Sequence, residues 1–358
     1  MFRRIIGNNN YLNVLLSVVV AFAVGAVILI AIGENPIEVY RQLLKCAFVG
    51  QMNFGGTLEK FVPIFITAIA FYMASVVKLF NVGVEGQMYL GAIASAWVGF
   101  TFAQLPAPLH MLMCFAFAVL AGGVWALISG VLAVRLKVNE ICTTILLNYV
   151  AILITQYLVN GPLSAGTGIS ITPPVADQVK LAWFFESSKA NTGLFVAIGI
   201  FALMFFMLRR TTAGFKLRNT GANPVFSEYI GIKTGMAILA GMFISGGIAG
   251  IAGCVQVLGV HHAFLNGFSS EIGFFGMLAA LISKGDIKML PIMSFLIAFL
   301  RNGALGMQRF TGMESSLVDI IITLFILITS MDWIINFFKE RKQGAVIAPG
   351  NEVQEGVE

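Results

Sequence analysis

Charged side chains are scarce in this sequence: they make up 11% of its 358 residues, against 58% hydrophobic residues. So few charges cannot provide the polar surface of a water-soluble globule of this length. Apolar runs recur along the chain, and each approaches the roughly 20 residues that a helix needs to cross a bilayer. The alternating pattern of barrel strands is missing, so helices must satisfy the backbone in lipid. We therefore expect an all-α polytopic membrane protein.

Cysteine and histidine are also rare, with four and three residues. The cysteines have no CxxC spacing, which argues against a disulfide framework or a metal site. The sequence contains no GxxxxGK[ST] phosphate loop, no HExxH and no GxSxG motif, so it does not predict an enzyme or an ATPase. We interpret the net charge of +5 as an excess of cytoplasmic Lys and Arg rather than as a nucleic-acid surface.

Ten candidate spans follow from the apolar runs and their charged or Gly/Pro boundaries. They lie near residues 11–32, 61–77, 87–104, 109–134, 141–158, 193–208, 236–256, 272–283, 289–306 and 317–337. The eighth and ninth are short or interrupted, which predicts some short or broken helices. An even number of spans puts both termini on the same side of the membrane. That side also holds most of the 22 Lys and Arg residues, so the positive-inside rule assigns it to the cytoplasm.

The spans predict one transmembrane domain over residues 1–343, followed by a polar tail at 344–358 that we expect to be disordered. Residues 159–192 contain three prolines and several glycines, which predict turns and extended chain on the outer side. The largest cytoplasmic segment is 209–235. Within it, Asn223 is suited to cap a helix, Pro224 to begin it and Gly231 to end it. A helix of about two turns is expected there, and docking on another protein is the preferred interpretation over a reentrant loop.

This segment, "GFKLRNTGANPVFSEYIGI", resembles the coupling segment of permease subunits in ATP-binding-cassette importers of the branched-chain amino acid, ribose and nucleoside branch. "FNVGVEGQMYLGA", "KVNEICTTILLNYVA" and "VQVLGVHHAFLNGFSSEIGFFGMLAALI" resemble nucleoside permeases that work with a basic-membrane-protein-type binding lipoprotein. The four motifs occur in matching order. The resemblance implies a multi-pass permease in the cell membrane of a prokaryote that imports nucleosides, with ribose-type sugars as the alternative.

The resemblance also implies partners: a cytoplasmic ATPase that binds ATP and Mg, a related second permease subunit, and an extracytoplasmic solute-binding lipoprotein. The chain itself would need no cofactor. The residues that match the ATPase-coupling motif are Gly221, Asn223, Pro224, Glu228, Tyr229 and Gly231.

Two groups of polar residues in apolar surroundings are candidates for the substrate path. Asn81, Glu85 and Gln87 lie between the second and third spans, where glycines can break a helix. Intramembrane carboxylates often mark a pathway, although Glu85 is equally consistent with a structural lock. In the fifth span, Glu140, Thr144, Asn148 and Thr155 share one helical face. That face either bonds neighbouring helices or lines the path; Asn148 is the best candidate for reading a nucleobase edge.

His261 and His262 are interpreted as interfacial loop residues, and Arg301 either lines a cavity or ends a short helix. A secondary transporter driven by an ion gradient remains an alternative function, because it too would use broken helices and buried carboxylates. A membrane-embedded enzyme ranks last, since no nucleophile-and-base cluster is evident. The nucleoside cannot be named from the sequence.

Overall fold

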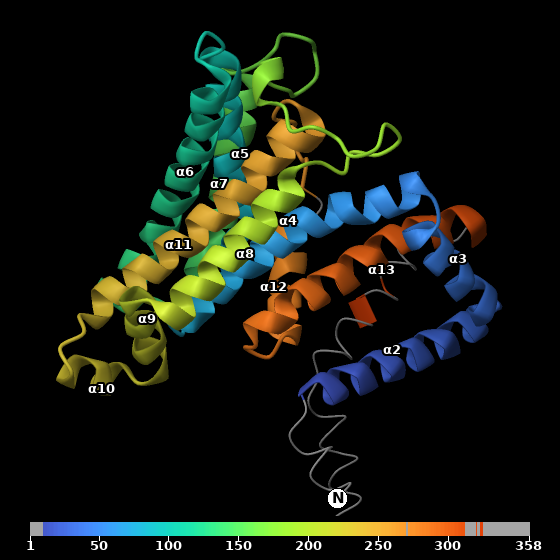
Figure 1. The fold of residues 1–358 in the computed structure, drawn as a ribbon, viewed down its shortest axis with the longest axis horizontal. Helices are drawn as coiled ribbons and strands as arrows, with labels where there is room; N and C mark the ends of the chain where they lie inside the picture. The colour runs from blue at the N-terminus through green and yellow to red at the C-terminus, as the bar shows by residue number, and fades with distance from the viewer. Residues whose placement is uncertain (1–9, 270, 312–319, 321–322, 325–358) are drawn as a thin grey trace, which may run out of the picture. The chain divides into compact units, whose positions relative to one another are not determined.

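The computed structural model describes residues 10–269, 271–311, 320, 323 and 324. Regular secondary structure in these residues is helical, with two isolated β-bridges in connecting segments, which confirms the expected all-α membrane fold. Six of the described helices are long and apolar enough to cross a bilayer, or seven if α2 and α3 form one broken span. Figure 1 shows the helices along the chain.

The chain divides into two compact units, one made of residues 1–39 with 313–358 and the other of residues 40–312. The described part of the first unit contains α2 (Asn10–Ile32), which matches the expected first span. Helix α3 (Pro36–Phe48) begins in the first unit and continues into the second.

The second unit contains all the other described helices and is a bundle of long, tilted helices (Figure 1). They are α4 (Gln51–Val76), α5 (Val84–Thr101), α6 (Ala107–Leu136), α7 (Glu140–Asn160), the 3₁₀ turn η1 (Asp177–Val179), α8 (Gly193–Arg210), α9 (Thr212–Ala222), α10 (Pro224–Tyr229), α11 (Thr234–Val255), the π-helical turn η2 (Gln256–His261), α12 (Ile272–Ile282), the 3₁₀ turn η3 (Ile287–Met289) and α13 (Leu290–Thr311).

Nine of the ten expected spans overlap a helix of the structure. The tenth, near 317–337, lies almost entirely outside the described residues, and the tail 344–358 lies wholly outside them. Helix α4 begins at Gln51, ten residues before the expected 61, because polar residues near its start are bonded inside the protein. The Asn302 amide of α13 donates to the Asn53 carbonyl at 2.8 Å and to the Thr57 hydroxyl at 3.0 Å.

Helix α11 lies at the centre of this unit and packs against α4, α5 and α6. Close approach of the backbones depends on glycine: a Cβ built at Gly250 would overlap the Ala118 carbonyl of α6, and one at Gly122 would overlap the Gly246 carbonyl. Small residues commonly mediate helix association in membranes, because they let van der Waals packing and close backbone contacts form.

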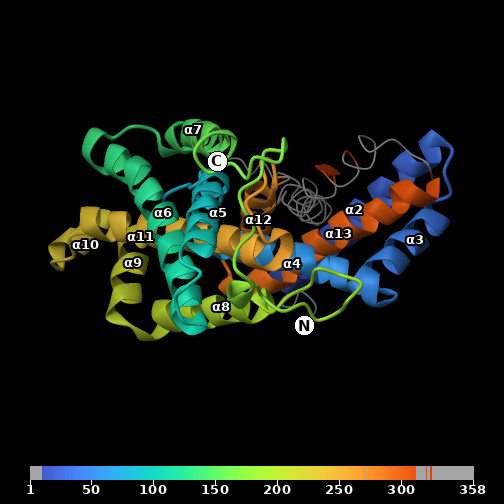
Figure 2. The same cartoon turned by 90° about the horizontal axis from the view of Figure 1, so that it is seen from above.

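The two ends of the bundle differ in structure. Residues 161–192, between α7 and α8, form turns, one short 3₁₀ turn and extended chain, as the prolines predict. This segment lies at one end of the bundle, whereas α9 and α10 lie at the other (Figure 1). Seen from above, α10 projects beyond the neighbouring helices (Figure 2).

Candidate functional site

The expected short helix is present as α10 (Pro224–Tyr229), and its ends are formed as the sequence predicts. The Asn223 side chain accepts a hydrogen bond from the Phe226 N–H at 3.0 Å, which satisfies one of the free donors of the first turn. Pro224 occupies the first helical position, and Gly231 adopts a φ of 82° just after the helix. This left-handed conformation is favourable for glycine and stops the helix.

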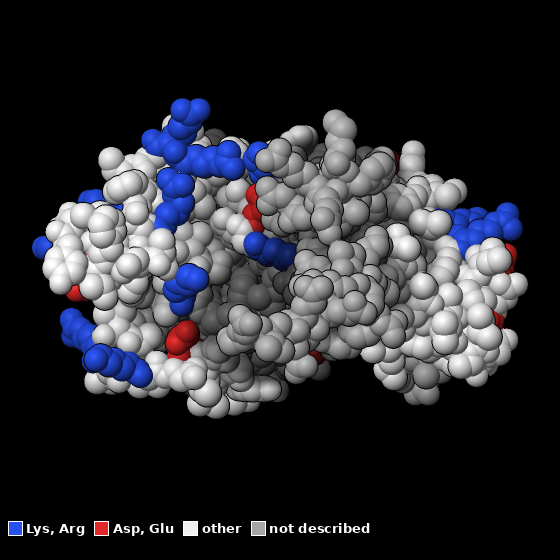
Figure 3. Space-filling view, turned by 90° about the horizontal axis from the view of Figure 1, so that it is seen from below, with Lys and Arg blue, Asp and Glu red and all other residues white. Residues whose placement is uncertain are grey.

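The outer face of α10 is apolar and exposed. Tyr229 is 84% exposed, Val225 62% and Phe226 53%. The same end of the bundle carries the basic residues that close α6 and α8, and Figure 3 shows Lys and Arg side chains gathered on the part of the surface where α8, α9 and α10 lie. Exposed aromatic and aliphatic side chains surrounded by basic residues have the composition of a protein-docking surface.

Two of the predicted coupling residues contact other parts of this chain: Gly221, which is buried, and Glu228, which is also exposed to solvent. The Glu228 carboxylate accepts a hydrogen bond from the Thr234 hydroxyl at 2.6 Å, and Thr234 begins α11. A Cβ at Gly221 would overlap the Val76 carbonyl at the end of α4, so glycine is needed for α9 to pack there. Glu228 and Gly221 therefore join the α9–α10 segment to the membrane helices.

The predicted break between α4 and α5 is held by a buried network of amides. Asn81 donates to the Gln87 side chain and to the Ser245 hydroxyl of α11, both at 2.9 Å. The Asn81 oxygen accepts from Gln87 at 3.1 Å and from the Gly83 N–H at 3.0 Å. Asn81 and Gln87 are at most 1% exposed. Each amide thus bonds the other, and the turn is fixed to α11.

Asn148 of α7 holds the same break from the opposite side. Its oxygen accepts from the Gly86 N–H at 2.8 Å, and its nitrogen donates to the Val82 carbonyl at 2.9 Å. The predicted polar face of α7 does turn inward, because Thr144, Asn148 and Thr155 are all buried. The contacts of Asn148 match the alternative in which this face bonds a neighbouring helix.

Glu85 is 5% exposed and lies in the first turn of α5. Its carboxylate accepts hydrogen bonds from the Gly273 N–H of α12 and from the Ser269 side chain. The free N–H groups and the dipole of a helix N-terminus favour a negative charge there. Glu85 therefore connects the start of α5 to the start of α12. Glu140, by contrast, lines a separate cavity of about 390 Å³ near Lys137 and Leu79.

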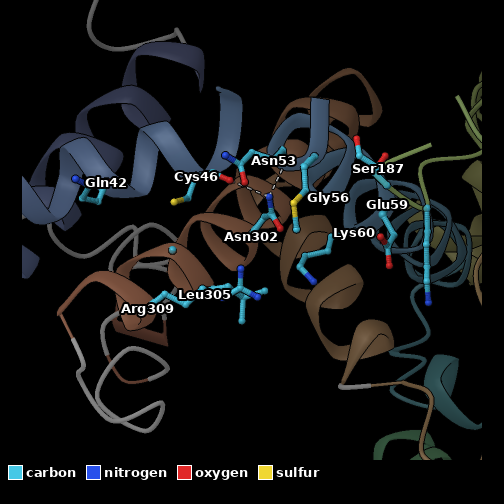
Figure 4. A pocket seen from close by; sticks show the side chains of 14 residues that line it. Gln42, Cys46, Asn53, Gly56, Glu59, Lys60, Ser187, Asn302, Leu305 and Arg309 are labelled. Carbon is cyan, nitrogen blue, oxygen red and sulfur yellow. Dashed lines mark hydrogen bonds between the residues drawn. The ribbon is translucent and has the colours of Figure 1, made fainter. Parts of the chain in front are cut away.

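Two further cavities follow α4 and α13. The first has a volume of about 570 Å³ and is bordered by Asn53, Glu59, Lys60, Asn302 and Arg309, whose side chains are drawn in Figure 4. The second, of about 160 Å³, is bordered by the same Glu59 and Lys60. Its other walls include Pro63, Gln256, His261, Phe268, Phe275 and Arg301. From the sequence we interpreted His261 as an interfacial loop residue, but it ends the π-helical turn η2 and lines this cavity. Arg301, for which two roles were open, lines the cavity.

Arg301 lines the second cavity and lies over the Phe275 ring, 4.3 Å from its centroid. His261 lines the same cavity, whereas His262 stacks on Trp183 with ring centroids 5.4 Å apart. Burial lowers the pKa of His262 below its usual 6.5, so this ring is neutral near pH 7. Among the described residues, no group of three or more His, Cys, Asp or Glu side chains is arranged to hold a metal ion.

The family model described as "Branched-chain amino acid transport system / permease component" matches residues 53–330. The guanosine ABC transporter permease protein NupP of Bacillus subtilis is 32% identical over 342 residues, which cover 92% of this chain and 97% of NupP.

The nucleoside ABC transporter permease protein NupB of Lactococcus lactis is 30% identical, covering 90% of this chain and 91% of NupB. The glucose ABC transporter permease protein TsgB13 of Haloferax volcanii is 29% identical, covering 92% of this chain and 88% of TsgB13. No solved structure matches the chain.

Proposed function

The chain belongs to the branched-chain amino acid transport system permease family, and we propose that it is the permease subunit of an ATP-driven nucleoside importer in the cell membrane of a prokaryote. The observation that carries the solute class is the likeness to NupP and NupB, at 30% identity or more over nine tenths of the chain. The chain is a transport component, and ATP and Mg are bound by a partner ATPase.

In this proposal α10 docks on that ATPase through its exposed face. Tyr229 is the centre of the contact because it is the most exposed large side chain of α10, and interface energy concentrates in such aromatic residues. Asn223, Pro224 and Gly231 fix the ends of the helix, so that it docks as a rigid element. Glu228 and Gly221 transmit its movement to α11 and α4.

In this proposal the end of the bundle that carries α10 faces the cytoplasm, and the basic residues that close α6 and α8 near it support this orientation. The segment 161–192 then faces outward, where a solute-binding lipoprotein delivers the nucleoside. A related second permease subunit completes the complex, as the resemblance of the sequence implies.

Asn81, Glu85, Gln87 and Asn148 serve transport in this proposal by holding the broken connection between α4 and α5. Support comes from the hydrogen bonds of this group to α7, α11 and α12. Thr144 bonds carbonyls of its own helix and contributes by packing beside Gly83. Interrupted helices with satisfied backbone groups are typical of transporters. Glu140 lines the cavity at the cytoplasmic end, where it borders Lys137.

A sugar is the second candidate solute, because TsgB13 is described as a glucose permease. Both can be tested by reconstituting the chain with its ATPase, second permease and binding protein in proteoliposomes. We expect purine or pyrimidine nucleosides to stimulate ATP hydrolysis, and pentoses, glucose and leucine to leave it at the basal rate. Stimulation by a sugar alone would transfer the assignment to sugars. Uptake that continues without the ATPase and collapses with an ionophore would instead indicate a secondary transporter.

A further inference from the structure

The two cavities along α4 and α13 adjoin each other, because both are bordered by Glu59 and Lys60. The first cavity is bordered by Asn53 of α4 and by Arg309 of α13. The second lies further along α4, at Pro63 and Ile64, and nearer the start of α13, at Arg301. The C-terminal end of α4 lies beside the α9–α10 segment, which faces the cytoplasm in the proposed orientation. The cavities therefore extend from the opposite, outer end of α4 to its middle.

The backbone around the second cavity departs from regular α-helix at two places. Pro63 lies inside α4 and has no N–H, so it cannot donate to the carbonyl of Glu59 one turn earlier. Across the cavity, Gln256, Val260 and His261 belong to the π-helical turn η2. Both features are common where membrane transporters place their solute sites, since irregular backbone in a bilayer is tolerated beside a cavity.

The charge of the lining is strongly one-sided. Its basic residues are Lys60, Lys189, Arg301 and Arg309, whereas its acidic residue is Glu59. Charged side chains that line a pathway determine the sign of the solute that passes. Repulsion at these walls therefore disfavours cationic solutes, and the N–H donors of Lys60 and Arg301 favour solutes rich in acceptors.

We propose that the two adjoining cavities are the solute route of the permease, and that Lys60 and Arg301 select neutral, acceptor-rich solutes over cations. The proposal rests on the proposed function and deepens it. A nucleoside suits the lining: its hydroxyls and base carbonyls accept hydrogen bonds from Lys60 and Arg301, the Gln256 amide reads the base edge, and Phe268 and Phe275 provide rings for stacking. The first cavity, at about 570 Å³, lies within the usual range for small-molecule sites, whereas the second, at about 160 Å³, lies below it. A nucleoside that contacts Gln256 and Arg301 therefore also occupies space in the first cavity.

Cys46 lines the first cavity and provides a native reporter, while Cys142, at the start of α7 near the opposite end of the bundle, is exposed and serves as an internal control. The full importer in proteoliposomes is treated with small methanethiosulfonates that carry either a sulfonate or a quaternary ammonium group. Modification of each thiol is followed by mass spectrometry of its own peptide.

We expect the anionic reagent to modify Cys46 faster than the cationic one by on the order of tenfold, as focusing of potential in a charged cleft predicts. Lys60→Met and Arg301→Met should reduce this ratio, and Lys60→Arg should retain it. A nucleoside that stimulates ATP hydrolysis should slow modification of Cys46 and leave Cys142 unaffected.

Equal rates for both reagents at Cys46 in the unmodified protein, a measurement that needs no variant, would overturn the proposed selectivity. Lack of protection by a solute that still stimulates ATP hydrolysis would overturn the route. A wrong nucleoside assignment would give another result. A sugar would then stimulate ATP hydrolysis and protect Cys46, which would support the route and change only the proposed solute.

Discussion

The carboxylate of Glu85 accepts a hydrogen bond from the backbone N–H of Gly273, and so joins two helices whose first turns are far apart in sequence. The contact depends on glycine at position 273, because a Cβ there would lie only 2.8 Å from the Glu85 backbone nitrogen. A buried acid in an apolar protein is thereby placed at a helix N-terminus, whose free N–H groups offset part of the cost of burying it. Its first measurable role is to hold α12 against α5.

Replacing Glu85 by alanine should lower the stability of the permease, since the Gly273 N–H would lose its acceptor in a buried site. The expected loss in the free energy of unfolding is about 1–3 kcal/mol. Glu85→Gln keeps an acceptor of similar shape and should lose less. Thermal unfolding in detergent measures both. Equal stability of the alanine variant and the native protein would contradict this role.

Asn148→Leu should both destabilise the protein and slow transport, because it leaves the Gly86 N–H and the Val82 carbonyl without the side chain that bonds them. We expect a loss of roughly 2–4 kcal/mol. Thr155→Val is the matched control: Thr155 is buried on the same face, but its hydroxyl bonds the Ile152 carbonyl of its own helix. Uptake and unfolding are compared at equal protein amounts, and ATPase binding should be unchanged. Normal uptake by Asn148→Leu would argue against the interhelical role.

Gly250→Val should disrupt the packing of α11 on α6, because any side chain at this position meets the Ala118 carbonyl. Overpacking of this kind costs about 1–3 kcal/mol, or more where backbone must move. Gly199→Val on α8 is the control, since a Cβ at Gly199 meets no atom within 4 Å. The yield of folded protein from the membrane, measured by size-exclusion chromatography, should fall for the first variant and stay near normal for the second.

Much of this architecture follows from the sequence alone, and the exceptions have physical causes. Helix spans and the capped helix at Pro224 depend on local signals: apolar runs, an Asn cap, and a glycine at positive φ. The role of Asn148 depends on backbone groups more than 60 positions earlier in the chain, which no local pattern specifies. The early start of α4 was missed because Glu59 and Lys60 resemble a membrane boundary, although in the fold they line a cavity.

Tyr229→Ala should weaken binding of the ATPase by about tenfold, because exposed aromatic residues at the centre of an interface commonly contribute more than 1 kcal/mol. Solute-stimulated hydrolysis and uptake should fall while the amount of permease in the membrane stays constant. Phe206→Ala is the control: Phe206 is 59% exposed but lies on the side of α8. Unchanged affinity of the Tyr229 variant for the ATPase would remove α10 from the docking surface.

We expect substitution of Glu228 to affect coupling rather than ATPase binding, unlike substitution of Tyr229. Because its carboxylate bonds the Thr234 hydroxyl at the start of α11, Glu228→Ala should leave ATPase binding near normal and reduce the uptake obtained per ATP hydrolysed. Thr234→Val removes the same hydrogen bond from its other side and should have the same effect.

The double variant distinguishes this link from two independent contacts. If Glu228 acts through Thr234, the combined loss of coupling should equal that of either single change, with an interaction energy of about 0.5–3 kcal/mol, as expected for residues in direct contact. Additive losses, or a Glu228→Ala variant that loses ATPase affinity while Thr234→Val does not, would show that the carboxylate contacts the ATPase itself. In that case movement of α10 must reach the membrane helices by another path, and the packing of Gly221 on the end of α4 is the contact that remains for it.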